Sequence, residues 1–222
     1  MEEKVKSRIA DVFDTYLNEY GTLLEKFEPC PIKDNEDIRY SLHEVNQVVN
    51  FLSAYRTKHN NSITWLEFPI RYKDGDKDGD KEQIIHIDGL IVDHDNRNVF
   101  FIEAKRLSKL QALKNLQADL NDKDQRRWED HKLNDYFNNK VELEKYGYYC
   151  ILLADFRKNT SSIKANTFGS SHLNDDGTLK WKEKMDDCSL KPIEEAIDPI
   201  KSVKGDYYLA YALFCLKNPA QE

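Results

Sequence analysis

The feature that most constrains the fold is a short, almost uninterrupted apolar run at residues 147–156, which contains Tyr148, Ile151 and Leu152 and carries no charge before Asp155. An alternating sequence would leave one face of a strand to water, whereas an apolar run of this length is typical of a strand covered on both faces. Strands are covered in this way when helices and a sheet form layers. We therefore predict an α/β protein in which residues 147–156 form a central strand.

Three segments before this run are rich in β-branched and aromatic side chains, as strands are, and short turn-forming segments separate them. We expect them to form an antiparallel meander of strands at residues 63–72, 83–92 and 98–105. Apolar residues at helical spacing predict helices at residues 4–20, 36–58, 107–120 and 125–143 and a closing helix at 206–216, with a further strand at 178–182. In the second helix the expected buried face consists of Ile38, Leu42, Val45, Val49 and Leu52.

The chain has 222 residues and a net charge of −7. This charge argues against a protein that coats nucleic acid through bulk positive charge, so any contact with nucleic acid must be local. No apolar stretch is long enough to span a bilayer, and the start of the chain lacks the apolar core of a signal peptide; we therefore expect a cytoplasmic protein with no membrane partner. The four cysteines are far apart in the sequence, which favours reduced structural thiols over a zinc site.

The two strands at 83–92 and 98–105 carry the candidate chemistry. Asp95 and Asn96 suit a two-residue turn between them, because Asp and Asn tolerate positive φ. That turn sets the register of the hairpin. The predicted pairs are His94–Arg97, Val92–Val99, Leu90–Phe101, Asp88–Glu103 and His86–Lys105, and the opposite face carries a core of Ile87, Gly89, Ile91, Phe100 and Ile102.

Asp88 and Glu103 would then face each other at about 4.5–5.5 Å between Cβ atoms, where two like charges destabilise a hairpin unless something neutralises them. Oxygen ligands at this density suit Mg²⁺ or Mn²⁺. Lys105 is two residues beyond Glu103 and shares its face, where an ammonium group could position a water or stabilise charge on a phosphate. The alternative is an exposed ion pair between Glu103 and Lys105.

Residues 86–89 (HIDG), a hairpin and residues 101–105 (FIEAK) resemble the core signature of the PD-(D/E)XK nuclease superfamily, with Ile87 in place of the proline of the family name. The order of the predicted elements agrees over about residues 36–156. The resemblance implies a restriction-endonuclease-like fold: a mixed central sheet, formed by an antiparallel meander plus a parallel strand, flanked by helices. A single domain of residues 1–222 would consist of this core, the helix at 4–20 and a C-terminal extension at 157–222.

The resemblance also implies roles for individual residues. Asp88, Glu103 and the backbone carbonyl of Ala104 would hold Mg²⁺ or Mn²⁺, and Lys105 would orient or activate the attacking water. Glu44 best matches the acid that family members carry on the helix before the meander, and would be a catalytic residue and a further metal ligand; the alternative is an ordinary surface glutamate. Four basic residues after the site either contact phosphates or belong to a solvated helix face: Arg106, Lys109, Arg126 and Arg127.

Residues 74–80 (DGDKDGD) match the first half of a calcium-binding loop, but Ile85 stands where such a loop has its bidentate glutamate, so we interpret them as an acidic turn. The expected function is a Mg²⁺-dependent endonuclease that hydrolyses phosphodiester bonds, with DNA as the expected substrate. The alternative is a catalytically inactive nucleic-acid-binding or regulatory protein of the same fold, in a defence or repair complex. A small interaction protein that dimerises through the helix at 206–216 is a third hypothesis, and a homodimer or a partner subunit is compatible with all three.

Overall fold

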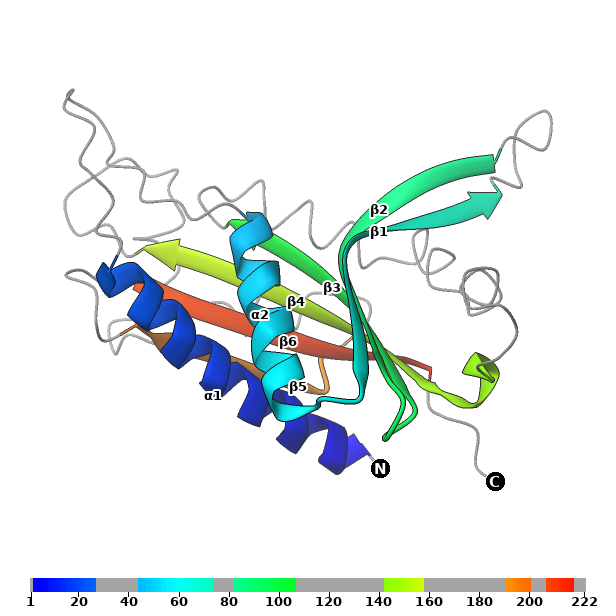
Figure 1. The fold of residues 1–222 in the computed structure, drawn as a ribbon, viewed down its shortest axis with the longest axis horizontal. Coiled ribbons are helices and arrows are strands. Elements are labelled where there is room, and N and C mark those ends of the chain that lie inside the picture. Colours follow the sequence, from blue (N-terminus) through cyan, green and yellow to red (C-terminus); the bar gives the residue numbers. More distant parts are fainter. Residues whose placement is uncertain are drawn as a thin grey trace.

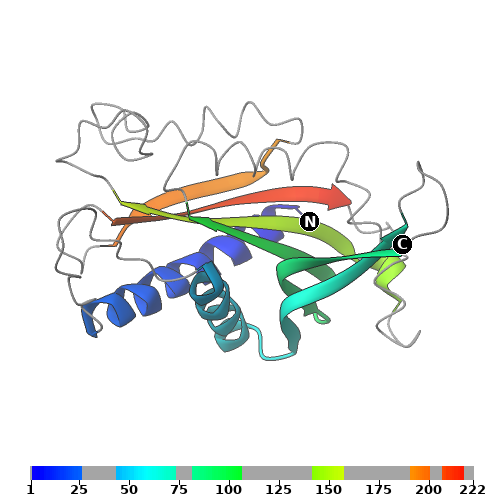
Figure 2. The same ribbon diagram turned by 90° about the horizontal axis from the view of Figure 1, so that it is seen from above.

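The computed structural model describes residues 2–26, 44–73, 82–106, 142–157, 191–200 and 207–217. Within these ranges the chain forms a six-stranded sheet with two helices. The elements are α1 (Glu2–Lys26), α2 (Glu44–Lys58), β1 (Ser62–Lys73), β2 (Glu82–Asp93), β3 (Asn98–Arg106), the 3-10 helix η2 (Leu143–Lys145), β4 (Gly147–Arg157), β5 (Glu194–Pro199) and β6 (Tyr207–Lys217). Both helices lie on one side of the sheet (Figures 1 and 2).

The strand order is β1-β2-β3-β4-β6-β5, with β3 and β4 parallel and every other neighbouring pair antiparallel. This arrangement confirms the α/β class, the mixed sheet and the antiparallel meander of the first three strands. The predicted central strand is confirmed as β4, whose residues 147–154 are buried. It is buried because β3 and β6 pair with its two edges and apolar layers cover both faces.

The side chains between the helices and the sheet form what we call the helix-side core. Helix α1 is longer at both ends than the predicted 4–20, and it contributes Val5, Ile9 and Phe13 at the predicted spacing. On the opposite face of the sheet lies the far-side core, which includes Leu90, Val92, Val99, Phe101 and Tyr148.

Helix α2 is confirmed from residue 44 to residue 58, while residues 36–43 lie outside the described part of the chain. Its predicted buried face is wrong in one respect, because Val49 is 44% exposed. The helix instead buries Val48, Phe51 and Tyr55 against the sheet. Apolar residues surround much of this helix, and the orientation that buries the two large aromatic rings removes more apolar surface from water than one that buries Val49.

The predicted closing helix at 206–216 is wrong, since residues 207–217 form strand β6 between β4 and β5. An apolar run buried on both faces resembles a buried helix in its hydrophobic pattern, and its aromatic content is the better guide, with Tyr and Phe at four of its eleven positions. Dimerisation through an apolar helix at this position is therefore excluded. Strand β5 was not anticipated; with β6, it adds part of the predicted C-terminal extension to the central sheet.

The register of the hairpin between β2 and β3 is confirmed, with Val92 opposite Val99 and Leu90 opposite Phe101. The predicted turn is wrong, because Asp93 pairs with Asn98 and residues 94–97 form a four-residue connection. The positive φ falls on Arg97, at 51°.

Residues 107–141, which include Lys109, Arg126 and Arg127, are not described, and neither are the loop at 74–81 or the predicted strand at 178–182. Predictions for these segments therefore stay predictions. Of the helices that are described, none combines the length and the apolar character that crossing a bilayer requires.

Candidate metal centre

The candidate site lies where β2 separates from β3. Strand β2 pairs with β1 from Glu82 to Asp93, whereas its ladder with β3 runs only from Asp93 to Gly89. Strand β3 continues to Arg106 beside β4. Figure 1 shows the hairpin of β1 and β2 curving away from the rest of the sheet. The last residues of β3 therefore have an edge that the backbone of β2 does not occupy.

Asp88 is the first residue of β2 beyond this ladder, and its carboxylate takes the place of the departing strand. Its Oδ2 accepts a hydrogen bond from the backbone N–H of Ala104 at 2.7 Å. In a strand the N–H and C=O of one residue point toward the same neighbour, so the carbonyl of Ala104 faces the same edge as its N–H. A carboxylate has about four acceptor sites, so this single bond leaves Asp88 able to coordinate a cation beside that carbonyl.

Glu103 precedes Ala104 and is partly buried. Since Ile102 and Ala104 belong to the helix-side core, Glu103 alternates to the opposite face, as does Phe101 of the far-side core. The side chain of Lys105 lies outside the described part of the chain, so its predicted place on the face of Glu103 stays a prediction.

The predicted ladder pairs Asp88–Glu103 and His86–Lys105 are wrong, because the ladder ends at Gly89–Ile102. His86 instead pairs with Pro69 of β1 and is exposed.

The bend that ends the ladder also changes the predicted core. Ile87 was expected on the same face as Ile91, but it lies in the far-side core, where it pairs with Phe68 of β1. Ile91 lies in the helix-side core. A regular strand would place these two residues on one face, so their separation marks the bend at Asp88.

Two local features account for this bend. The ladder between β1 and β2 omits a single pair, Glu67–Asp88, and Glu67 has a φ of 52°. A non-glycine residue in that conformation costs about 1–3 kcal/mol and persists only where its surroundings impose it. Next to Asp88, Gly89 lies directly beneath α2, where an added Cβ would come within 2.8 Å of Val48 Cγ1. The sequence carried no signal for Glu67, which occupies an ordinary position in an alternating strand.

The donor set fits a hard divalent cation. Two carboxylates and a carbonyl oxygen suit Mg²⁺, which typically takes one or two carboxylates from the protein and completes its shell with water or phosphate. Within the described ranges, no three His, Cys, Asp or Glu residues stand close enough to form a larger ligand set. Any third acidic ligand would have to come from elsewhere, as the prediction for Glu44 supposes.

Glu44 is the first residue of α2, and its side chain is not described. Helix α2 packs on the face of Ala104, opposite to that of Glu103, so the assignment of Glu44 depends on the resemblance alone. Sequence reasoning missed Gln47, one turn further along α2, which is fully buried. The sequence carried no signal for it, because a glutamine near the start of a helix is ordinary and only the structure shows its burial.

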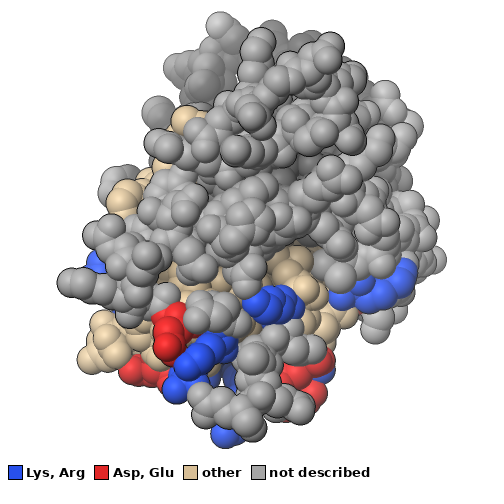
Figure 3. All heavy atoms as spheres, turned by 90° about the vertical axis from the view of Figure 1, so that its right-hand side faces the viewer, with Lys and Arg blue, Asp and Glu red and all other residues tan. Residues whose placement is uncertain are grey.

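The net charge of −7 argues against a surface of bulk positive charge. Figure 3 shows one face of the molecule, on which the described Lys and Arg side chains lie beside Asp and Glu side chains instead of forming a patch of one sign.

No protein-family model, no curated protein and no solved structure matches this chain. The likeness to the PD-(D/E)XK superfamily therefore depends on the residues and on the order and pairing of the elements.

Proposed function

We propose that the protein is a Mg²⁺-dependent nuclease that hydrolyses phosphodiester bonds of DNA. The observation that carries the proposal is the carboxylate of Asp88 at the open edge of β3, bonded to the N–H of Ala104 and next in line to Glu103. Carboxylates beside a backbone carbonyl, at a strand edge that β2 does not occupy, suit divalent cation binding better than they suit folding stability.

In this proposal each residue has a distinct task. Asp88, Glu103 and the carbonyl of Ala104 hold the cation, and the hydrogen bond from Ala104 fixes the orientation of the Asp88 carboxylate. Lys105 orients the attacking water or stabilises charge on the phosphate, and Glu44 adds a further acid. When bound, Mg²⁺ would stabilise the negative charge that develops on the phosphate oxygens.

The test compares wild type with Asp88→Asn, Glu103→Gln and Lys105→Ala on plasmid and single-stranded DNA, with Mg²⁺, Mn²⁺ or EDTA. Asparagine keeps an oxygen that can accept the bond from Ala104, so Asp88→Asn should fold normally. We expect each variant to lose cleavage by about a hundredfold or more, as removal of one electrostatic stabiliser does. The matched control is Asp14→Asn, the same chemical change at an exposed position of α1.

Cation binding is measured separately, as the rise in unfolding free energy on adding Mg²⁺. A ligand at a hundred times its dissociation constant adds about 2.7 kcal/mol, and Asp88→Asn should reduce this gain while Asp14→Asn should not. A wild type that gains stability from Mg²⁺ through Asp88 but cuts neither substrate would refute the nuclease and favour the non-catalytic alternative. A wild type that shows neither effect would refute the metal centre.

A further inference from the structure

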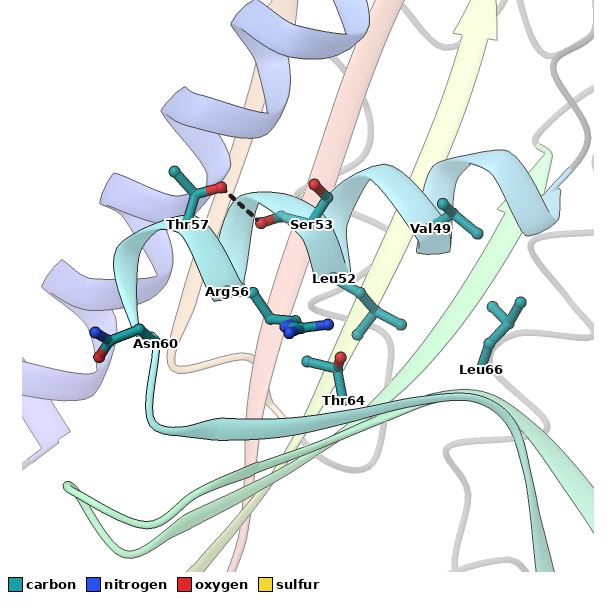
Figure 4. Close-up of a pocket in the computed structure, with 8 residues that line it drawn as sticks. All are labelled: Val49, Leu52, Ser53, Arg56, Thr57, Asn60, Thr64 and Leu66. Atoms are coloured by element: carbon teal, nitrogen blue, oxygen red, sulfur yellow. Dashed lines mark hydrogen bonds between the residues drawn. The ribbon is translucent and has the colours of Figure 1, made fainter.

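A groove of about 510 Å³ lies between the exposed side of α2 and the start of β1 (Figure 4). Three apolar side chains line it, of which Val49 and Leu66 are 44% and 37% exposed. The other five lining residues are polar. The complete lining consists of Val49, Leu52, Ser53, Arg56, Thr57, Asn60, Thr64 and Leu66.

The groove has an unusual charge for so acidic a protein. Among the described residues that line it, Arg56 is the only charged one and none is a carboxylate, although the chain carries a net charge of −7. Figure 4 shows Arg56 reaching from α2 into the space above Thr64. In the described part of the chain Arg56 forms no ion pair and no hydrogen bond, unlike Lys58, which pairs with Asp11 at 3.0 Å. A guanidinium left without a carboxylate is available to an anionic ligand.

One end of the groove borders the strand that carries Asp88, on the side of the sheet that α2 covers. Leu66 lines that end and pairs with Gly89, the residue next to Asp88. Val48 lies against Gly89 on the helix side, and Arg56 is eight residues further along α2. Eight residues of helix span about 12 Å, which is the length of three to four stacked nucleotides.

We propose that this groove binds one strand of nucleic acid beside the strand that carries Asp88. A backbone phosphate is held by Arg56, and sugars or bases contact Val49 and Leu66. The inference rests on the proposed function, since the groove matters for catalysis only if the centre cuts. A nucleic-acid strand fits better than an acidic peptide because it presents a phosphate at each nucleotide, beside sugars that suit the neutral polar groups of Ser53 and Asn60.

The test measures binding of labelled single-stranded DNA and RNA by fluorescence anisotropy in EDTA, so that no cutting occurs. We expect Arg56→Gln to weaken binding about three- to tenfold and to lower the slope of log K against log salt by about 0.7, the contribution of one phosphate contact on a single strand. Lys4→Gln is the matched control, because Lys4 is an exposed cation of α1 outside the groove, and it should change affinity less than twofold. A purely structural effect of Arg56 would leave the salt slope unchanged.

The two proposals fail in different ways. If Arg56→Gln weakens binding but the wild type never cuts, the groove is supported and the nuclease is refuted. If the wild type cuts through Asp88 and Arg56→Gln binds as the wild type does, the nuclease stands and the groove inference is overturned. Three other results would also overturn the inference. The protein could bind neither single-stranded DNA nor single-stranded RNA, or Arg56→Gln could leave the salt slope unchanged. Duplex DNA or an acidic peptide could also displace the bound strand at a lower concentration than single-stranded nucleic acid does.

Discussion

The close approach of α2 to β2 makes Gly89 the position where a single methyl group should have the largest effect. A Cβ added there would lie 2.8 Å from Val48 Cγ1 and 3.4 Å from Ile102 Cβ. Elsewhere in a strand, replacing Gly with Ala would stabilise the fold by about 0.5–1 kcal/mol. Here Val48 is fully buried and must move, so we expect Gly89→Ala to destabilise the protein by about 1–3 kcal/mol, as overpacking does.

The complementary variant, Val48→Ala, removes two methyl groups from the helix-side core. Their transfer to water costs about 1.6 kcal/mol, and the cavity left behind raises the loss to about 2–3 kcal/mol. In the double variant the new methyl group of residue 89 occupies part of that space. The double variant should therefore be more stable than the sum of the single effects predicts, by about 1–2 kcal/mol.

Equilibrium unfolding in urea of the four proteins in this cycle gives the coupling energy directly. Val48→Ala combined with Val99→Ala is the control, because Val99 belongs to the far-side core, across the sheet. The effects of these two substitutions on the free energy of unfolding should add to within about 0.5 kcal/mol. Additivity within the same limit for Gly89→Ala and Val48→Ala would show that α2 does not press on the bend, and would refute our account of why β2 turns there.

Two further predictions concern the turn between β2 and β3 and its neighbours. Tyr55→Phe removes the 2.7 Å hydrogen bond from the Tyr55 hydroxyl to Asp93 Oδ2. Because Asp93 is only 1% exposed, the free energy of unfolding measured in urea should fall by about 1.5–3 kcal/mol. The same substitution should have a much smaller effect in a protein that already carries Asp93→Asn. Burial lowers the pKa of His59 below its usual 6.5, although the negative charge of Asp93 opposes this shift. As the pH falls below about 6.5, His59 therefore binds a proton in the unfolded chain before it does so in the folded protein. Stability should therefore fall from about pH 6.5 down to the lowered pKa of His59, and His59→Gln should flatten this part of the profile; an unchanged profile would contradict the assignment.

The pairing of β2 with β3 could be predicted because it follows from a local rule. Side chains alternate along a strand, so a shift of one residue would move Asp88 to the face that carries the core residues Gly89 and Ile91. The turn could not be predicted in the same way. Asp93 closes the connection by accepting bonds from the N–H and the side chain of Asn96. Tyr55 from α2 and Arg8 from α1 also bind Asp93, and these partners are distant in the sequence.

The wrong prediction of a helix at residues 206–216 has a similar cause. The pattern of Leu209, Leu213 and Leu216 has helical spacing, but the structure uses residues 209–214 on both faces of a strand. What decides between these outcomes is the edge of β4, which needs a partner for its backbone groups, and β4 ends fifty residues before β6 begins. A local pattern contains no information about such a partner.

The candidate site combines both kinds of information. Alternation along β3 places Glu103 and Lys105 on one face, and this much needs only the sequence. The separation of β2 from β3 depends on the conformation of Glu67 and on the packing of Val48 against Gly89, which are tertiary features. Sequence reasoning placed Asp88 opposite Glu103, whereas in the structure the Asp88 carboxylate accepts a hydrogen bond from the backbone of Ala104.

The separation of the two strands also explains why this edge is suited to a ligand. Continued in register, β2 would place Ile87 opposite Ala104, and the backbone of Ile87 would occupy both the N–H and the carbonyl of Ala104. Ile87 pairs with Phe68 instead, and the Asp88 carboxylate satisfies only the N–H. A carboxylate cannot donate a hydrogen bond to the remaining carbonyl, whereas a cation binds both groups at once. The bend beside Glu67 thus leaves the carbonyl of Ala104 and the carboxylate of Asp88 on a common edge, where a continued ladder would have paired the backbone of Ala104 with that of Ile87.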